Sequence, residues 1–366
     1  MKFTITRDAL LKPLQIVSGA VERRSTLPIL GNVLLQVSED SLRMTGTDLE
    51  VELVSSVTLE GAEPGDITVP AKKLLDIVRS LGEGADVRIE AADDKVIVRS
   101  GKSRFTLSSL PATDYPNIEE WQSEIKLEIT QGKLKHLIER THFSMANQDV
   151  RYYLNGMLFE VNDNVLRTVA TDGHRLAMAS SPLEQSALPH KQVIVPRKGI
   201  SELMRLLDSD DGLLELSLGQ NHIRVQTGGM TFTSKLLDGR FPDYRRVIPT
   251  GGNRIVIASR ELLKQSCVRV AILSNEKFRG VRITLDGQEM SLTANNQEQE
   301  KADERLEVNY NGESMEVGFN VNYLLDVVNA IEGEQVKLTL TDENSSALVE
   351  DAATDGAVYV IMPMRL

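Results

Sequence analysis

Residues 69–78 read VPAKKLLDIV, and two later segments of the chain repeat this pattern. The second is VPRKGISELM at residues 195–204, 126 positions further on, and the third is FNVNYLLDVV at residues 319–328, another 124 positions on. Each copy places an acidic residue directly before an apolar pair, and apolar spacing at i, i+3 and i+4 is typical of an amphipathic helix. A pattern that recurs at nearly constant spacing predicts a chain built from internal repeats.

Two further patterns keep the same period. A short alternating strand followed by a helical pattern occurs at residues 3–10, 127–134 and 255–262. The motif LRMTGTD, which starts at residue 42, has counterparts that start at residues 166 and 290. Generic strand–helix patterning is the alternative explanation, but several matches in one order favour a true repeat of about 125 residues.

The repeats predict an α+β fold of three tandem copies of one domain. Helices are expected at residues 7–18, 71–80, 131–142, 197–207, 260–270 and 320–330. Alternating stretches between them, such as KVIVR at residues 95–99, indicate antiparallel sheets with one solvent-exposed face. The domains are expected to span residues 1–124, 125–252 and 253–366, and PTGGN at residues 249–253 is typical of a linker at the second boundary.

Composition indicates a soluble, cytosolic protein. The 366 residues include one cysteine, Cys267, which cannot form an internal disulfide or a Cys-rich metal site. The chain starts without a secretory signal, and no apolar run approaches the ~18 residues of a membrane span. A net charge of −12 argues at first against a nucleic-acid partner, since phosphates would be repelled.

The charge is divided unevenly between the expected helices and the rest of the chain. The six helical segments carry +8 in total, which leaves −20 for the remainder of a chain whose net charge is −12. Lys and Arg are good helix formers and could simply solvate exposed helix faces. Recurrence in five of six helices favours a basic surface that the helices build together.

A second asymmetry separates the two ends of the chain. Residues 99–104 carry +3 and residues 298–304 carry −3. Either run could be an ordinary solvated surface. Complementary charges at corresponding edges of the first and third repeats favour head-to-tail association, which closes a ring or extends as a filament.

The sequence contains no recognised catalytic or cofactor motif. It lacks a phosphate-binding GxxxxGK[ST] loop, a GxSxG elbow and an HExxH helix, and its five histidines lack metal-ligand spacing. We therefore expect no enzyme, no cofactor and no metal. One alternative is a hydrolase centred on Asp172 and His174, and another is a three-domain scaffold that does not contact nucleic acid.

Five longer motifs are distinctive: QDVRYYLNGM at residues 148–157, TDGHRL at 171–176, DGRFPDYRRV at 238–247, SNEKFRG at 274–280 and the terminal MPMRL at 362–366. Together they closely resemble the bacterial sliding clamps, the β subunits of DNA polymerase III. The resemblance covers the whole chain in order. It implies a processivity factor that has no catalytic centre of its own.

The resemblance implies a head-to-tail homodimer whose clamp domains form a closed ring around duplex DNA. Basic helices would line the hole and bind DNA independently of sequence, while the acidic remainder faces outward. The ring would tether the DNA polymerase III α subunit, the clamp loader, other DNA polymerases and repair proteins through short clamp-binding peptides, which makes rebinding to the primer end effectively intramolecular. No membrane partner is implied.

The resemblance also assigns residues to three sites. The implied DNA contacts are Arg24, Lys73, Gln148, Tyr152, Tyr153, Arg197 and Lys198, although one of the two tyrosines could belong to the core. The implied partner-peptide cleft comprises Leu154, Thr171, Gly173, His174, Arg175, Leu176, Pro242, Arg246, Val247, Tyr323, Ser346, Val360, Met362 and Met364. The implied dimer interface comprises Phe105, Leu107, Ile272 and Leu273 with the charged residues Arg104, Glu298, Glu300 and Glu304.

Two features of the implied cleft have a chemical reading of their own. Met362 and Met364 carry flexible thioethers that can repack around different ligands, although an ordinary final strand would explain them equally well. Asn344 stands where family members often have an apolar residue, so the rim of the cleft is expected to differ in detail.

Overall fold

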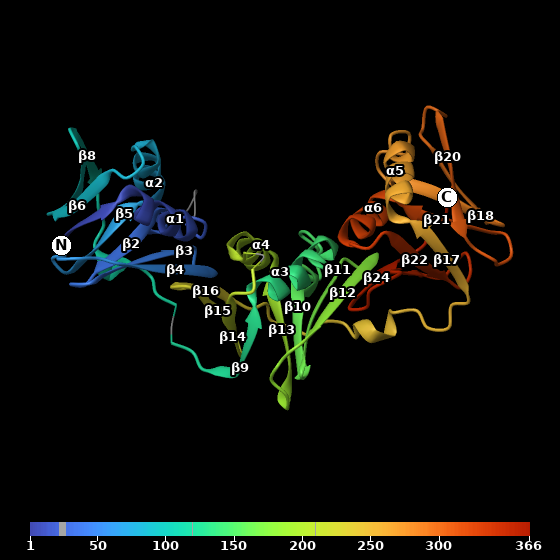
Figure 1. Cartoon of the computed structure of the whole chain (residues 1–366), viewed down its shortest axis with the longest axis horizontal. Helices are drawn as coiled ribbons and strands as arrows, with labels where there is room; N and C mark the ends of the chain where they lie inside the picture. The colour runs from blue at the N-terminus through green and yellow to red at the C-terminus, as the bar shows by residue number, and fades with distance from the viewer. Residues whose placement is uncertain (22–26, 119, 209) are drawn as a thin grey trace. The chain divides into compact units, whose positions relative to one another are not determined.

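The computed structural model describes residues 1–21, 27–118, 120–208 and 210–366, which divide into two compact units. The first unit comprises Met1–Gly132 and Lys198–Leu236, and the second comprises Lys133–Arg197 and Leu237–Leu366. The middle repeat therefore contributes one part to each unit. Figure 1 labels most of the helices and strands of both.

An eight-stranded antiparallel sheet spans two repeats in the first unit, in the order β5-β2-β3-β4-β16-β15-β14-β9. Its central contact is the pairing of β4 with β16, which places Leu53 opposite Phe232 and Ser55 opposite Met230. The hydrogen-bond ladder thus continues from the first repeat into the middle one. The strands are β2 (Asn32–Val37), β3 (Ser41–Thr47), β4 (Val51–Thr58), β5 (Gly65–Pro70), β9 (Ser123–Thr130), β14 (Leu213–Gly219), β15 (His222–Thr227) and β16 (Met230–Lys235).

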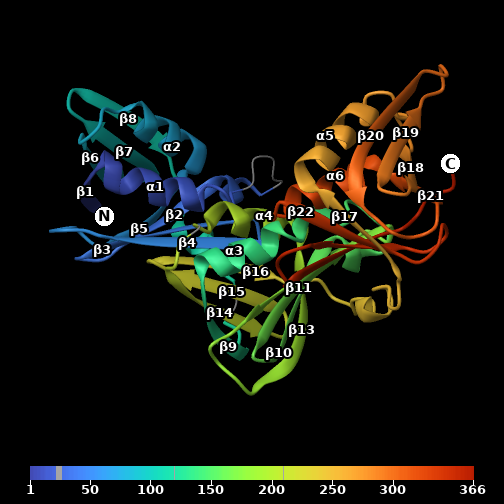
Figure 2. The same cartoon turned by 45° about the vertical axis from the view of Figure 1, so that its right-hand side comes forward.

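A smaller sheet and two helices complete the N-terminal part of this unit. The sheet runs β1 (Lys2–Thr6), β6 (Asp86–Ala92), β7 (Lys95–Ser100) and β8 (Ser103–Ser108), so β8 forms one of its edges. Helices α1 (Arg7–Val17) and α2 (Ala71–Ser80) lie side by side (Figure 2). Their buried apolar residues recur at helical spacing, which explains why these segments form helices packed on the sheets. The 3₁₀ turns η1 (Pro28–Gly31) and η2 (Ala112–Asp114) also belong to this unit.

A twelve-stranded sheet organises the second unit, in the order β13-β10-β11-β12-β24-β23-β22-β17-β20-β19-β18-β21. The middle and third repeats join where β12 pairs with β24, with Leu176 opposite Val360. The middle repeat contributes β10 (Gly156–Asp163), β11 (Val165–Thr171), β12 (Arg175–Pro182) and β13 (Leu188–Pro196). The third contributes β17 (Arg254–Ser259), β18 (Gly280–Asp286), β19 (Glu289–Asn295), β20 (Lys301–Asn309), β21 (Met315–Asn320), β22 (Gln335–Leu340), β23 (Ala347–Asp351) and β24 (Ala357–Ile361).

Helices α5 (Arg260–Ala271) and α6 (Val321–Ala330) pack against each other and bury one apolar face each. Ser259 accepts a hydrogen bond from the backbone of Leu262, and Asn320 accepts one from Asn322, so side chains cap both helix N-termini. Their core includes the single cysteine, Cys267, and burial raises the pKa of its thiol to about 12. This cysteine is therefore a neutral core residue at physiological pH.

The helix α4 (Arg197–Leu206) and the other expected helices lie within one residue of their predicted bounds, but α3 ends early. The sequence predicted residues 131–142, whereas α3 spans Gln131–Glu139. The hydroxyl of Thr141 donates to the Leu137 carbonyl at 2.8 Å, while the Thr141 amide turns to Ile138. The chain therefore tightens and continues as the 3₁₀ turn η3 (His142–Ser144). In the part of the chain that the structure describes, no helix is both long and apolar enough to cross a membrane.

Candidate binding sites

The implied cleft residues at 171–175 form the tight turn between β11 and β12. Asp172 accepts hydrogen bonds from the backbone amides of His174 at 2.9 Å and Arg175 at 3.1 Å, and Thr171 accepts one from Gly173. Gly173 has φ +89°, a left-handed conformation that favours glycine. The Asp172 carboxylate thus holds the turn. Its bonds come from the backbone amides of His174 and Arg175, whereas a carboxylate that orients a catalytic histidine would bind the imidazole ring. The hydrolase alternative gains no support from this geometry.

The guanidinium of Arg175 contacts three segments: the β11–β12 turn, α6 and η3. It reaches Asp172 at 3.1 Å and Asp326 of α6 at 2.5 Å, and it donates to the Phe143 carbonyl at 2.6 Å. It also lies 4.4 Å from the ring centroid of Tyr323. Only 11% of the Arg175 side chain is exposed. Arg175 therefore joins β12 to α6 and η3. Its positive charge is already paired with carboxylates inside the protein.

Several apolar residues of the implied cleft belong to one packed cluster. Leu176 and Val360 are buried there with Phe241 and Tyr244, and Tyr153 packs against its edge. The backbone amide of Met362 donates to the His174 carbonyl at 3.0 Å, which continues the chain from β24 beside the turn. Leu154, at the end of η4 (Tyr152–Leu154), is also buried.

The remaining implied cleft residues differ in exposure. Pro242 and Val247 flank the 3₁₀ turn η5 (Tyr244–Arg246), and both are exposed, as is Arg246, which pairs with Asp243. Ser346 is partly buried just before β23, and Asn344 is exposed in the preceding turn. Met364 lies further away along the tail, where its amide donates to the Gly318 carbonyl of β21 at 2.7 Å. There it lines a hollow with Phe278 and Leu366.

The implied DNA contacts fall in both units. In the second unit Gln148 and Tyr152 are exposed, with 52% of Tyr152 accessible, whereas Tyr153 packs against the apolar cluster. The two tyrosine rings meet edge to face at 5.8 Å between centroids. One tyrosine is thus a surface residue and the other is largely core, which is the alternative that the sequence left open.

The basic residues of this set differ in exposure and in the bonds that they form within the protein. Arg197 donates to the Met145 carbonyl at 3.1 Å and is partly buried, while Lys73 is exposed on α2. In the first unit Lys198 forms an ion pair with the buried carboxylate of Asp48. Arg24 lies outside the described residues.

Sequence reasoning missed two residues that order the 148–155 segment. Arg151 donates to Asp149 through its backbone amide at 2.8 Å and through its guanidinium at 2.9 and 3.0 Å. These bonds lower the pKa of Asp149 to about 2. Arg151 also donates to the Asp172 carbonyl at 3.3 Å, so it links η4 to the turn that carries His174. The Asp-Val-Arg spacing was visible in the sequence, but nothing in it indicated this long-range contact.

Known families match this chain over nearly its full length. The N-terminal, central and C-terminal domains of the DNA polymerase III beta subunit match residues 1–119, 128–243 and 245–365. The chain belongs to the DNA polymerase III beta subunit family. Relatives named "Beta sliding clamp" from Salmonella typhimurium and Escherichia coli are 58% and 57% identical to it, over all of both chains.

Solved structures of this family agree with the assignment. The DNA polymerase III beta subunit of Pseudomonas aeruginosa is 57% identical, with a TM-score of 0.98 over all of both chains, and it has also been crystallised bound to griselimycin. The Caulobacter crescentus protein is 41% identical, with a TM-score of 0.94 over all of both chains. The family resemblance, the α+β fold of three tandem clamp domains and the function as a DNA sliding clamp are therefore confirmed. The family is named for a clamp and not for a reaction.

The residues implied at the dimer interface of this sliding clamp lie on two separate edges. On β8, Arg104 is exposed and Phe105 is partly exposed, whereas Leu107 is only 8% exposed and packs into its own domain. At the end of α5, Ile272 is 75% exposed and Leu273 is partly buried.

The acidic residues implied on the other edge lie on or just before β20. Glu298 and Glu300 are exposed, and Glu300 accepts a hydrogen bond from Asn296 at 2.6 Å. Glu304 accepts two from Arg269 at 2.7 Å. These internal bonds already use part of the acidic charge of the edge.

Proposed function

We propose that two copies of this sliding clamp close head-to-tail into a ring around duplex DNA and tether the replicative polymerase. The observation that supports this most is the full-length identity of 57–58% to beta sliding clamps. Retention would come from topology, so only weak, sequence-independent phosphate contacts are needed. The tether makes polymerase rebinding effectively intramolecular, which is the physical basis of processivity.

Two free strand edges support the head-to-tail closure. β8 pairs with β7 on one side and lies at the edge of its sheet. On β20, residues 301–307 pair with β19, and only Val308 and Asn309 pair with β17 on the other side. Antiparallel addition of β8 from one chain to β20 of a second chain would satisfy both edges. Exposed Ile272 lies at the end of α5, which packs on β20, and would be covered by the same contact.

We further propose clamp domains at residues 1–124, 125–252 and 253–366, with basic helices facing DNA. Lys73 on α2 and Gln148 and Tyr152 near η4 are exposed and suit phosphate or sugar contact. Lys198 would do so with part of its charge offset by Asp48, which favours sliding over tight binding. Arg24, Tyr153 and Arg197 remain in the proposed set on the family resemblance.

We propose that partner peptides bind the residues around Leu176, Val360 and η5. The likeness to the Pseudomonas aeruginosa protein, crystallised with griselimycin, leads us to propose that this chain binds griselimycin as well. Exposed apolar residues beside a buried cluster suit a short apolar peptide. The partners would be the polymerase III α subunit, the clamp loader and other polymerases and repair proteins, all in the cytoplasm.

Retention on DNA tests the ring. The protein is loaded onto nicked circular DNA, washed in high salt, and the DNA is then linearised. We expect stable retention on the circle and rapid loss after linearisation, because a ring slides off free ends. Equal, salt-resistant retention on both forms would contradict the proposal. Charge reversal at Lys198 with no effect on loading would favour the scaffold alternative.

Peptide binding is tested separately with a fluorescent peptide that carries the clamp-binding segment of the polymerase III α subunit. Val247→Glu should weaken its binding at least about tenfold, because a charge would be placed in an apolar contact. Ile255→Glu on β17 is the matched control, since Val247 is 46% and Ile255 47% exposed. Equal binding by both variants would contradict the location of the cleft.

A further inference from the structure

Five side chains converge on one buried carboxylate in β10. Glu160 is 0% exposed and accepts hydrogen bonds from Tyr244 at 2.5 Å and from Arg245 at 2.9 Å. Gln192 and Arg167 each donate to it at 2.8 Å, and the Nε2 atom of His190 lies 3.0 Å away. No other carboxylate in the described ranges is shown with as many side-chain donors.

The donors come from two kinds of source. Arg167 and Gln192 lie directly opposite Glu160 on the neighbouring strands β11 and β13, so sheet register alone brings them together. Tyr244 and Arg245 lie more than 80 residues away along the chain, on the short turn η5. The carboxylate thus connects a rigid sheet to a loop segment that has little backbone structure of its own.

This arrangement keeps Glu160 charged. Burial by itself raises the pKa of the carboxyl, but the donors, with Tyr244 foremost among them, outweigh burial and lower the pKa to about 2. A buried carboxylate is costly unless its lone pairs are satisfied, so loss of any donor disturbs the remaining set. Arg245 is further fixed because its guanidinium lies 4.9 Å from the ring centroid of Tyr244.

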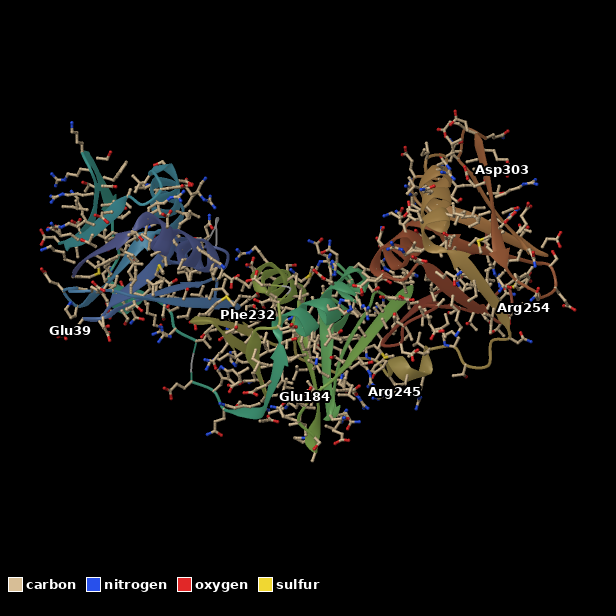
Figure 3. The ribbon with its side chains drawn as sticks, in the orientation of Figure 1. Glu39, Glu184, Phe232, Arg245, Arg254 and Asp303 are labelled. Carbon is tan, nitrogen blue, oxygen red and sulfur yellow. The ribbon has the colours of Figure 1, made fainter. Side chains whose placement is uncertain are left out.

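The anchored turn lies within the proposed peptide cleft. Pro242 precedes η5, Arg246 ends it and Val247 follows it, and all three are exposed. Tyr244 itself is buried in the cluster that contains Leu176 and Val360. Figure 3 labels Arg245 beside the strands of the middle repeat. Glu160 therefore lies beneath the segment whose outer side chains would meet the peptide.

We infer that Glu160 is a positioning residue for partner-peptide binding: its carboxylate holds Tyr244 and Arg245, and through them it sets the place of Pro242, Arg246 and Val247. This inference rests on the proposed function of the cleft. Glu160 does not touch the peptide. It acts by preorganising one wall, so that less ordering of the loop is required on binding.

The test separates positioning from general stability by using mild variants. Tyr244→Phe removes one hydroxyl from Glu160 and keeps the buried ring, and Arg245→Met removes the cation, while Arg245→Lys restores it. Glu160→Gln replaces the carboxylate at similar volume. Glu350→Gln is the matched control, because Glu350 on β23 also pairs with a basic strand residue, Lys337, at 3.1 Å, but not with η5.

Two measurements are made on each full-length dimer. The first is the affinity for the fluorescent α-subunit peptide, with griselimycin as a second probe. The second is amide hydrogen exchange over residues 238–249, compared with exchange in α5. Tyr244→Phe and Arg245→Met each remove a hydrogen bond to a charged group, so peptide affinity should fall roughly tenfold in both, and further in Glu160→Gln. Arg245→Lys should recover part of the loss.

The outcomes distinguish a failure of the positioning role of Glu160 from a failure of the proposed peptide cleft. Faster exchange confined to residues 238–249, together with weaker peptide binding and unchanged retention on circular DNA, supports the positioning role. Unchanged affinity in Tyr244→Phe and Arg245→Met overturns it, even if Glu160→Gln fails to fold. Equal loss in Glu350→Gln, or accelerated exchange throughout the unit, also overturns it, since both indicate a general effect on stability. If the unmodified protein binds neither probe, it is the proposed cleft that fails.

Discussion

The edge strand β8 and the part of β20 that pairs on one side only carry opposite charge, but this charge is paired to different extents within the chain. On the β8 side, Arg99, Lys102 and Arg104 form no ion pair within the described ranges. On the β20 side, Glu304 pairs with Arg269 and Asp303 with Lys301. The −3 of the sequence already includes Lys301, but Arg269 lies outside that run and pairs with Glu304, so the run alone overstates the acidic charge of this edge. Apolar contact should dominate ring closure, with charge as a smaller, salt-sensitive contribution.

The largest effect should come from charging the apolar end of α5. Ile272→Glu combined with Leu273→Glu should give monomers, because two carboxylates would be buried without partners at the interface. Light scattering after size exclusion measures the mass directly. Leu262→Glu is the control, since Leu262 is another exposed apolar residue of the same helix. A dimer of unchanged mass in the double variant would refute the interface.

Substitutions of the two apolar residues of β8 should have different effects, one on the dimer and the other on the stability of the domain. Phe105 is partly exposed, so Phe105→Ala should weaken the dimer roughly tenfold with little change in domain stability. Leu107 is nearly buried, so Leu107→Ala should lower the free energy of unfolding by about 2–5 kcal/mol. Thermal unfolding and dimer dissociation are measured on the same samples. If Leu107→Ala weakens the dimer without loss of stability, Leu107 contacts the second chain instead of its own core.

The difference between the β8 and β20 sides shows how much of an interface the sequence alone could predict. The internal repeats and the helical spacing predicted all six helices, because periodicity reports directly on the buried face of each element. The charge runs were also visible as sequence. Their internal pairing was not, because Arg269 lies 35 residues from Glu304 and meets it only through the packing of α5 on β20.

The candidate cleft shows the same limit. Motif resemblance named Arg175 as a cleft residue, but its contacts with Asp326 and Phe143 depend on how β12 and α6 pack. Glu160 was not singled out at all, since a single glutamate in an apolar strand has no distinguishing local pattern. Its role depends on Tyr244 and Arg245, which approach from far along the chain. Sequence patterns thus identify elements and families, whereas side-chain partners separated by many residues require the fold.

A moderate effect should follow charge reversal on the basic edge. Arg104→Glu should weaken the dimer several-fold at low salt, because it places a negative charge opposite the acidic edge. The effect should shrink as salt rises from about 0.1 M to about 1 M, where the Debye length falls from ~10 Å to ~3 Å. Dilution series at both salt concentrations measure this. An effect that does not depend on salt would indicate a packing role for the Arg104 side chain.

The smallest effect should come from Glu304→Gln. Hydrogen bonds from Arg269 lower the pKa of Glu304, so in the folded chain its carboxylate is charged and already paired above its ordinary pKa of 4.5. A carboxylate whose pKa is lowered in the folded state stabilises the fold fully above its ordinary pKa, here 4.5. This stabilisation is lost as the pH falls through the lowered pKa. Neutralising Glu304 at neutral pH should therefore change dimer dissociation less than Arg104→Glu does, and mainly release Arg269 to the solvent. Parallel dilution series measure dimer dissociation in the two variants. A larger change in Glu304→Gln than in Arg104→Glu would contradict this expectation. It would mean that, in the unmodified protein, the Glu304 carboxylate leaves Arg269 and pairs with the basic edge of the second chain when the ring closes.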